Sequence, residues 1–405
     1  MTLSNFTSLT HSIFYFALIL CACTGTKKEY DQGNPKPTTS NYETVLVADS
    51  IITFDIDHKT SLHNSKLQYI ENDSGRYLAF LNRMDRRILF FNMETRIISY
   101  EVKFEKDGPN GIGEKLVAFH IMTLDSIIIR PESPYELCLV DTSGTVKKRY
   151  HPTLENSLVP TNDIPYIATG HNYGMMALGG NIVFYSSPDG WQGDYFGTFE
   201  KQVLVSINIQ NGSWRYLDVS YPLEYYETKG YWHSVQRSAG TAVDGNKVVL
   251  SFGISHYLDA YENGKISKHF AGSEYLTNPI LPPFKRLPGT FKKRQRALLD
   301  LPLYFFIRYD PYRRVYYRFV LHPHEDESVL GDINRIFVEK PFSIIILNEK
   351  FEKIGETMMP QNKYYTVDNF VGRQGLYISN NHPDNPGIDE DKLSYTLLKL
   401  KTNDI

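Results

Sequence analysis

The chain has 405 residues, a formal net charge of -3 and a pI near 6.5. This balance argues against the basic surface of a nucleic-acid-binding protein, and we expect no nucleic-acid partner. A chain of this length can bury enough apolar surface to fold without disulfides. Its 29 Tyr and 23 Phe favour β-strands.

The N-terminal segment has the features of a targeting signal. The apolar run from Ile13 to Leu20 is too short to span a bilayer, which needs about 20 apolar residues. The following Cys21-Ala22-Cys23 completes a segment that resembles the lipobox of bacterial lipoproteins, in which the final Cys receives lipid. The resemblance implies a signal peptide over residues 1–22 and membrane attachment through Cys23. No Lys or Arg precedes the apolar run, which leaves an uncleaved anchor or an ordinary secretory signal as alternatives.

Residues 23–42 are rich in Gly, Pro, Asn, Thr and Ser, and this composition predicts a flexible tether before a folded domain over residues 43–405. If Cys21 leaves with the signal and Cys23 carries lipid, Cys138 has no partner for a disulfide. Its place between Leu137 and Leu139 predicts a small buried apolar residue.

Hairpins of one form recur along this domain, each an apolar strand, a polar turn and a second strand. Their turns lie at 93–95, 142–144, 211–212, 263–264 and 349–350. Asn-Gly pairs, as at Asn211-Gly212, are strong hairpin signals because both central residues need positive φ. Two more strand-like runs precede each hairpin, for example Leu67 to Ile70 and Tyr77 to Leu81.

Four strands per unit, repeated about every 40 to 55 residues, indicate propeller blades. The chain is all-β and divides into six blades near 66–104, 116–150, 174–219, 234–270, 303–358 and 364–400. The last blade has three clear strands, and an N-terminal strand within Val45 to Phe54 would complete it and close the ring. A β-sandwich followed by a second β-domain is the alternative.

The blade pattern resembles the TolB-like six-bladed β-propellers. Lys106 to Gly113 after the first blade and Leu124 to Ile127 in the second, taken with the lipobox and tether, resemble an uncharacterised family of Gram-negative envelope lipoproteins with a domain of unknown function. The resemblance covers nearly all of the mature chain. It implies an outer-membrane lipoprotein that faces the periplasm or the exterior, and it implies no catalytic residues.

Motifs for chemistry are absent from the sequence. The loop from Gly108 to Gly113 lacks the ending of a phosphate-binding P-loop, and the twelve His form no His-Glu-x-x-His arrangement. No Gly-x-Ser-x-Gly elbow occurs. The acidic loop from Asp384 to Asp391 matches no calcium loop. We therefore predict no catalytic residue, no metal and no cofactor. The basic run from Lys285 to Arg296 predicts a surface excursion that ends in a short helix.

Aromatic residues in two polar loops are the candidate ligand-binding residues: Trp191, Tyr195, Tyr225, Tyr231, Trp232 and His233. Loops between propeller blades gather at the mouth of the central channel, so these rings could line one pocket and stack on a sugar ring or a peptide. The alternative is that they plug the channel or cover the edges of blades.

Two functions fit these features. The first is a monomeric, membrane-tethered binding or scaffold module for a glycan, a peptide or an envelope protein. The second is a hydrolase or lyase that acts on a polysaccharide or peptide, with carboxylates and His at the channel mouth. An enzyme of that kind needs two titratable groups near one substrate atom, and no motif in the sequence indicates them, so binding is favoured.

Overall fold

The computed structural model describes residues 44–402 except 64–65, 159–163, 169, 171–173, 187–200, 229, 277, 283 and 287. Cys23, the expected signal peptide and the whole of the expected tether lie outside the described residues. Two of the candidate ligand-binding residues, Trp191 and Tyr195, lie outside them as well.

Six four-stranded antiparallel sheets build the domain, which confirms the predicted six-bladed β-propeller. The first three blades are β2 to β5 (Leu67–Asn72, Gly75–Asn82, Arg87–Asn92, Ile98–Lys103), β6 to β9 (Leu116–Thr123, Ser126–Pro131, Leu137–Val140, Val146–Tyr150) and β10 to β13 (Met175–Leu178, Asn181–Tyr185, Gln202–Asn208, Trp214–Ser220). The next two are β14 to β17 (Ala239–Asp244, Lys247–Phe252, Tyr257–Glu262, Lys265–Phe270) and β18 to β21 (Leu303–Asp310, Val315–Leu321, Phe342–Asn348, Lys353–Met358). Blade 6 contains β22 (Tyr365–Gly372), β23 (Gly375–Ser379), β24 (Lys392–Thr402) and β1 (Thr44–Asp55).

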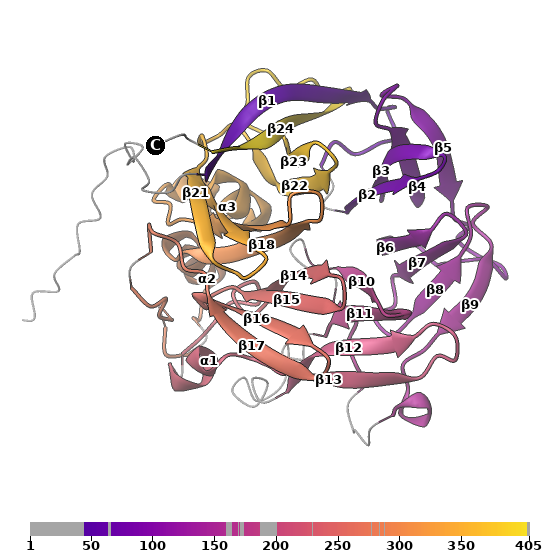
Figure 1. Cartoon of the computed structure of the whole chain (residues 1–405), viewed down its shortest axis with the longest axis horizontal. Coiled ribbons are helices and arrows are strands. Elements are labelled where there is room, and N and C mark those ends of the chain that lie inside the picture. The colour runs from indigo at the N-terminus through magenta and orange to yellow at the C-terminus, as the bar shows by residue number, and fades with distance from the viewer. Residues whose placement is uncertain are drawn as a thin grey trace, which may run out of the picture. The chain divides into compact units, whose positions relative to one another are not determined.

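The first strand of each blade lies at the centre of the ring (Figure 1). These strands contact one another in a closed circuit: β2 with β6, β6 with β10, β10 with β14, β14 with β18, β18 with β22, and β22 with β2. The last strands lie at the perimeter. Residues on the first strands of distant blades can therefore approach one another around the centre.

The outermost strand of blade 6 comes from the N-terminal end of the domain. β1 pairs with β24 along its length, from Thr44 opposite Thr402 to Asp55 opposite Lys392, with an irregularity between Ala48 and Ser50. β1 also touches blade 5, where the Leu46 backbone N–H donates to Thr357 Oγ1 at 2.9 Å. A Cβ on Gly355 would lie 2.0 Å from the Thr44 carbonyl oxygen, so glycine permits this close approach.

The polar hairpin turns of blades 1 and 3 share one geometry. In blade 3 the Asn208 side chain accepts from the backbone of Gln210 and Asn211, and Gly212 follows with φ of 80°. Asn side chains favour such turns because they bond to the backbone two residues on. Gly meets the left-handed backbone at low cost, since it has no Cβ.

The hydrophobic cores lie between neighbouring blades, because each sheet buries both faces. One cluster joins blades 1 and 2 and contains Cys138, which is fully buried as predicted. Another joins blades 2 and 3 around Trp214, whose indole N–H donates to the Thr153 carbonyl at 2.6 Å. A third joins blades 6 and 1 and contains Phe54 of β1.

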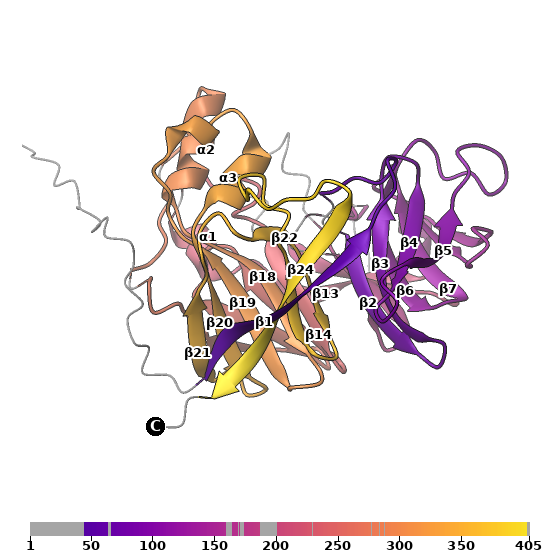
Figure 2. The same ribbon diagram turned by 90° about the horizontal axis from the view of Figure 1, so that it is seen from above.

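Helices occur only in the connections among the described residues. They are α1 (Leu223–Glu227), α2 (Phe291–Asp300) and α3 (Ile333–Glu339), with short 3-10 turns at Leu154–Asn156 and Glu327–Val329. α2 ends the basic run predicted to form a surface excursion, and α2 and α3 pack side by side beyond the strand ends (Figure 2). None of the described helices combines the length and apolar character needed to cross a membrane.

Candidate functional site

Two of the aromatic candidates lie in the hydrophobic core rather than at a pocket surface. Trp232 and Tyr225 are fully buried, and their rings meet edge to face at 5.9 Å. The Tyr225 hydroxyl donates to the backbone carbonyl of Gln236. Both rings therefore stabilise the packing of blades 3 and 4, and neither presents a face to a ligand in this structure. The expected pocket shared with Trp191 and Tyr195 stays a prediction, because those two residues lie outside the described ranges.

The remaining candidates of this loop are held by local contacts. Tyr231 is half-buried, and its backbone N–H donates to the Phe284 carbonyl at 2.7 Å. His233 is half-buried, and burial first, then the charges of Arg237 and Arg294, lower the pKa of its imidazole to about 4. His233 is therefore neutral at pH 7, and Nδ1 interacts with the Val235 backbone at 3.4 Å.

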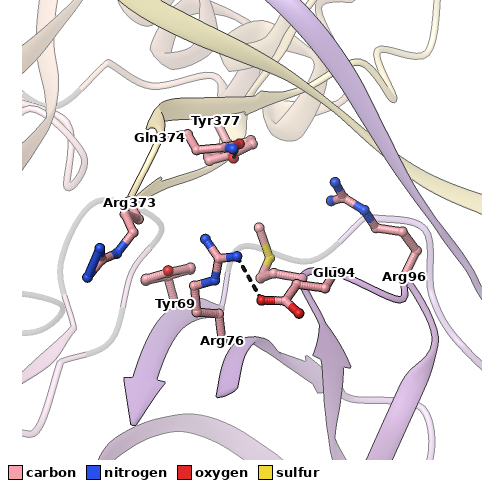
Figure 3. A pocket seen from close by; sticks show the side chains of 8 residues that line it. Tyr69, Arg76, Glu94, Arg96, Arg373, Gln374 and Tyr377 are labelled. Atoms are coloured by element: carbon pink, nitrogen blue, oxygen red, sulfur yellow. Dashed lines mark hydrogen bonds and ion pairs between the residues drawn. The ribbon is translucent and has the colours of Figure 1, made fainter. Parts of the chain in front are cut away.

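A different site opens between blade 1 and blade 6. A cavity of about 130 Å³, here called the rim pocket, is lined by Tyr69, Arg76, Met93, Glu94, Arg96, Arg373, Gln374 and Tyr377 (Figure 3). These residues come from β2, β3, the β4–β5 turn, the β22–β23 turn and β23. The pocket thus exists only when the first and last blades are adjacent.

Two of the three arginines in the rim pocket already have carboxylate partners. Arg76 donates to Glu94 Oε1 at 2.8 Å, the bond drawn in Figure 3, and Glu94 raises the pKa of Arg76. Arg373 pairs with Glu71 Oε1 at 3.0 Å just outside the pocket. The lining carries three positive charges and one negative charge, so the pocket favours an anion.

Arg96 has no carboxylate within ion-pair distance among the described residues. One of its terminal nitrogens, Nη1, is buried and forms no hydrogen bond with any part of the chain that the structure describes. Its guanidinium lies 5.8 Å from the centre of the Phe54 ring. A buried donor without an acceptor costs about 1–3 kcal/mol, so an oxyanion at this point would relieve a real deficit.

The backbone of Arg96 adopts a conformation that side chains disfavour. Its φ is 67°, and its N–H donates to the Asn92 carbonyl at 3.0 Å. Gly212 occupies the same position of the blade 3 turn, with its N–H on the Asn208 carbonyl. A non-glycine residue with positive φ is uncommon, and such strain gathers at functional sites. The turn can therefore form with glycine at this position, and the arginine side chain of blade 1 is not needed for its geometry.

Stacked rings form one wall of the rim pocket. Phe370 lies between Tyr377, at 4.7 Å and 7°, and Tyr69, at 6.4 Å and 8°. Tyr377 is buried and donates its hydroxyl to Gln374 Oε1 at 3.0 Å, while Tyr69 is half-buried. Burial raises the pKa of both phenols, so both remain protonated hydrogen-bond donors at pH 7. The wall is rigid, because each ring is fixed by its neighbour.

A polar network ties the pocket to blade 5. Glu71 of β2 accepts from the Tyr312 hydroxyl at 3.0 Å and from Arg373 Nε at 3.0 Å. Burial raises the pKa of the Glu71 carboxyl, but the bonds from Tyr312 and Arg373 outweigh it and lower the pKa overall. Three blades therefore hold Arg373 in place, and the pocket is preorganised on that side.

The chemistry available in the rim pocket is recognition of an anion. Glu94 is the one carboxylate among the eight lining residues, and it is paired with Arg76. Across the described ranges, no group of three or more His, Cys, Asp or Glu side chains is arranged to hold a metal ion.

The sequence does contain one local feature that indicates the rim pocket, although the aromatic residues of the loops were chosen as candidates instead. The hairpin turns repeat, and the position of Gly212 in one turn is taken by Arg96 in another. A long cation in a position suited to glycine is a feature that local structure does not explain. The pairing of blades 1 and 6 that completes the pocket had no such local signal.

Comparison with solved structures shows the same fold in other proteins. A member of the DUF4221 family from Bacteroides vulgatus ATCC 8482 matches with 25% identity and a TM-score of 0.73, covering 89% of this chain and 99% of its own. A protein of Bacteroides fragilis NCTC 9343, described as exported, matches with 9% identity and a TM-score of 0.52, covering 89% and 96%. A catalytically inactive virginiamycin B lyase from Staphylococcus aureus is 10% identical, with a TM-score of 0.42 and coverage of 86% and 99%, too distant to bear on activity.

The search of curated proteins returned no match. Residues 43–358, which comprise most of the chain, match the model of a domain of unknown function, DUF4221. They include blades 1 to 5 and β1 of blade 6. This chain is therefore a member of the DUF4221 family.

Proposed function

We propose that this chain is a binding propeller, held at an envelope membrane by lipid on Cys23, whose rim pocket receives an acidic side chain of a peptide or protein partner. Arg96 carries the proposal. It is a guanidinium with a buried, unbonded nitrogen, held in a strained backbone conformation beside two arginines that are already paired. The lipobox-like Leu20 to Cys23 segment supports the membrane attachment.

The size of the rim pocket favours a single carboxylate over a sugar ring. A cavity of about 130 Å³ admits one acidic side chain, and its opening between two turns suits a chain that passes across it. Tyr377 and Phe370 are buried and stack on each other, so neither ring offers an exposed face to a sugar. Carboxylates bind arginine through short, charge-assisted hydrogen bonds, and the two groups match in geometry.

Binding explains the rim pocket better than hydrolysis or a lyase reaction does. General acid–base catalysis needs two titratable groups near one substrate atom, with their pKa values moved apart. Glu94 is already neutralised by Arg76, and the other charged lining residues are arginines, which remain protonated.

The variant Arg96→Gly should lower the affinity for an acidic peptide without lowering the stability of the fold. Glycine suits a φ of 67°, so the variant should be as stable as the wild type or slightly more stable. It removes the unpaired guanidinium, and a hydrogen bond to a charged group is worth about 1.5–3 kcal/mol, so affinity should fall at least about tenfold. Fluorescence anisotropy would measure binding of a labelled Glu-containing peptide to the full chain in detergent, beside a peptide with Gln in place of Glu.

Arg86→Gly is the matched control. Arg86 is also an arginine of blade 1 with positive φ, at 57°, and it lies outside the rim pocket. Arg86→Gly removes one positive charge and one strained backbone conformation, as Arg96→Gly does, but it should leave the affinity for the peptide unchanged. The proposal fails if the wild type binds neither peptide, or if both glycine variants bind equally well. Binding of an oligouronate in place of the acidic peptide would make the rim pocket a glycan site.

A further inference from the structure

The Arg76–Glu94 ion pair places a carboxylate of the chain itself in the rim pocket. Arg76 Nη2 donates to Glu94 Oε1 at 2.8 Å, and both side chains line the same cavity as Arg96 (Figure 3). The other nitrogens of the Arg76 guanidinium make no hydrogen bond to a residue that the structure describes. Glu94 therefore uses the bond from Arg76 that a partner's carboxylate would otherwise accept.

The backbone holds the turn that carries Glu94 beside Arg76. The Met93 N–H donates to the Arg76 carbonyl at 2.9 Å, which ties the β4–β5 turn to β3. Within the turn, Asn92 Oδ1 accepts from the Glu94 N–H at 2.8 Å and from the Thr95 N–H at 2.9 Å. The turn thus uses the backbone of Glu94 and does not use its side chain.

Other turns of the propeller carry no carboxylate at this position. In blade 3, Asn208 Oδ1 accepts from the Gln210 N–H at 3.0 Å, and in blade 5, Asn348 Oδ1 accepts from the Lys350 N–H at 2.9 Å. Each of these residues lies two positions after the asparagine of its turn, as Glu94 does in blade 1. An amide or an ammonium is compatible with such a turn, so the hairpin does not explain the glutamate of blade 1.

Solvent exposure makes the Arg76–Glu94 pair easy to exchange. The Glu94 side chain is 64% exposed, and the Arg76 side chain is 31% exposed. Exposed ion pairs contribute little to stability, because water solvates the separated charges well. Glu94 can therefore leave Arg76 at little cost in stability, and the guanidinium can then bind another carboxylate through short, charge-assisted hydrogen bonds.

Glu94 also weakens the attraction that an incoming anion meets. Glu94 and Arg96 lie two residues apart on one turn, so the carboxylate opposes the charge of Arg96 as well as that of Arg76. Like charges a few Å apart repel, even near the surface of a protein. Without Glu94 the eight lining residues would carry three positive charges and no negative charge.

We propose that Glu94 is an internal competitor, which occupies Arg76 until the carboxylate of a partner replaces it. The inference rests on the proposed function of the rim pocket, and it adds Arg76 to Arg96 as a second donor for the partner. A carboxylate on the same chain has a high effective concentration at its own site. Small free anions are therefore excluded, whereas a peptide can replace Glu94 because its other residues also contact the protein.

Glu94→Gln tests the proposal in the full chain in detergent, by fluorescence anisotropy with the labelled Glu-containing peptide. Glutamine has nearly the shape of glutamate and occupies the corresponding position of the blade 3 turn, so the fold should be unchanged. Removing the competitor should raise the affinity for the peptide about three- to fivefold, which is the effect of losing one exposed ion pair.

Glu101→Gln is the matched control. Glu101 is also an exposed glutamate of blade 1, it pairs with Arg87 at 2.6 Å, and it lies outside the rim pocket. Its replacement should leave the affinity for the peptide unchanged. The double variant Glu94→Gln with Arg76→Gln distinguishes competition from simple repulsion. It should bind as the wild type does, because the released guanidinium is then absent.

The outcomes separate this inference from the proposed function. If the wild type binds the peptide and Glu94→Gln binds it equally well or more weakly, the competitor is refuted and the acidic-peptide site stands. A gain that persists in the double variant would show that Glu94 only repels the partner, and it would also overturn the proposal. If neither the wild type nor Glu94→Gln binds the peptide, the inference and the proposed function fail together.

Discussion

Arg318 of β19 joins blade 5 to blade 4 through a buried guanidinium, and replacing it tests how the blades are held together. The side chain is fully buried and donates to Ser251 Oγ and to four backbone carbonyls, at 2.6 to 3.3 Å. The guanidinium also stacks 3.6 Å from the centre of the Tyr304 ring. Burial lowers the pKa of Arg318 to about 10, so it is charged at pH 7.

The stability change follows from these bonds. Arg318→Met removes five hydrogen bonds from a charged donor, each worth about 1.5–3 kcal/mol, and leaves buried carbonyls unsatisfied. Removing the charge also removes its desolvation cost of several kcal/mol, so we expect a net loss of about 3–5 kcal/mol. At an unfolding entropy of about 2 cal/mol/K per residue, this lowers Tm by about 4–7 °C. Arg318→Lys keeps the charge but donates at most three bonds, and should fall between the two.

Differential scanning calorimetry at pH 7 measures these shifts. Arg215→Met, which removes an exposed arginine, is the control and should change stability by less than about 0.5 kcal/mol. If the Tm of Arg318→Met lay within about 1 °C of the Tm of the control, the four backbone carbonyls would have found other hydrogen-bond donors. The role given to Arg318 would then be refuted.

Three further predictions concern β1, a buried lysine and the membrane anchor. Gly355→Ala places a methyl group against the Thr44 carbonyl, so it should loosen β1 and lower Tm, whereas Gly289→Ala, with open space around it, should not. Lys340 is buried, donates to three backbone carbonyls at the end of α2, and has a pKa lowered by burial to about 7. The unfolded chain then binds one more proton between about pH 7 and pH 10.5, so this group makes stability rise with pH in that window, and Lys340→Met should flatten the rise in urea titrations. Cys23→Ala should release the protein from the membrane fraction, and its retention after a carbonate wash would contradict lipid attachment.

The blades could be predicted from the sequence because their signals are local. Predicted ranges such as 116–150 and 303–358 coincide with the observed sheets. Alternating apolar runs and turn residues determine a hairpin within a few positions, and Cys138 between apolar neighbours is buried for the same reason.

The site could not be predicted because it depends on contacts between distant segments. Trp232 lies in a polar stretch, yet it is buried against Tyr225, which no local pattern reveals. The rim pocket combines Arg96 of blade 1 with Arg373 of blade 6, and the two meet only after the ring closes. Side-chain partners across such a distance are fixed by topology rather than by sequence neighbours.

The pairing of β1 with β24 has a consequence for how the domain is made. β1 is the first strand of the domain to leave the ribosome, and β24 is the last, so blade 6 stays incomplete until synthesis of the domain is finished. During that interval the edge of β1 is a template for intermolecular pairing. Closing a long loop costs only about 0.6 kcal/mol more for each doubling of its length, so the difficulty is one of timing rather than of final stability. A chaperone that shields β1 until β24 arrives would raise the yield of folded protein without changing its Tm.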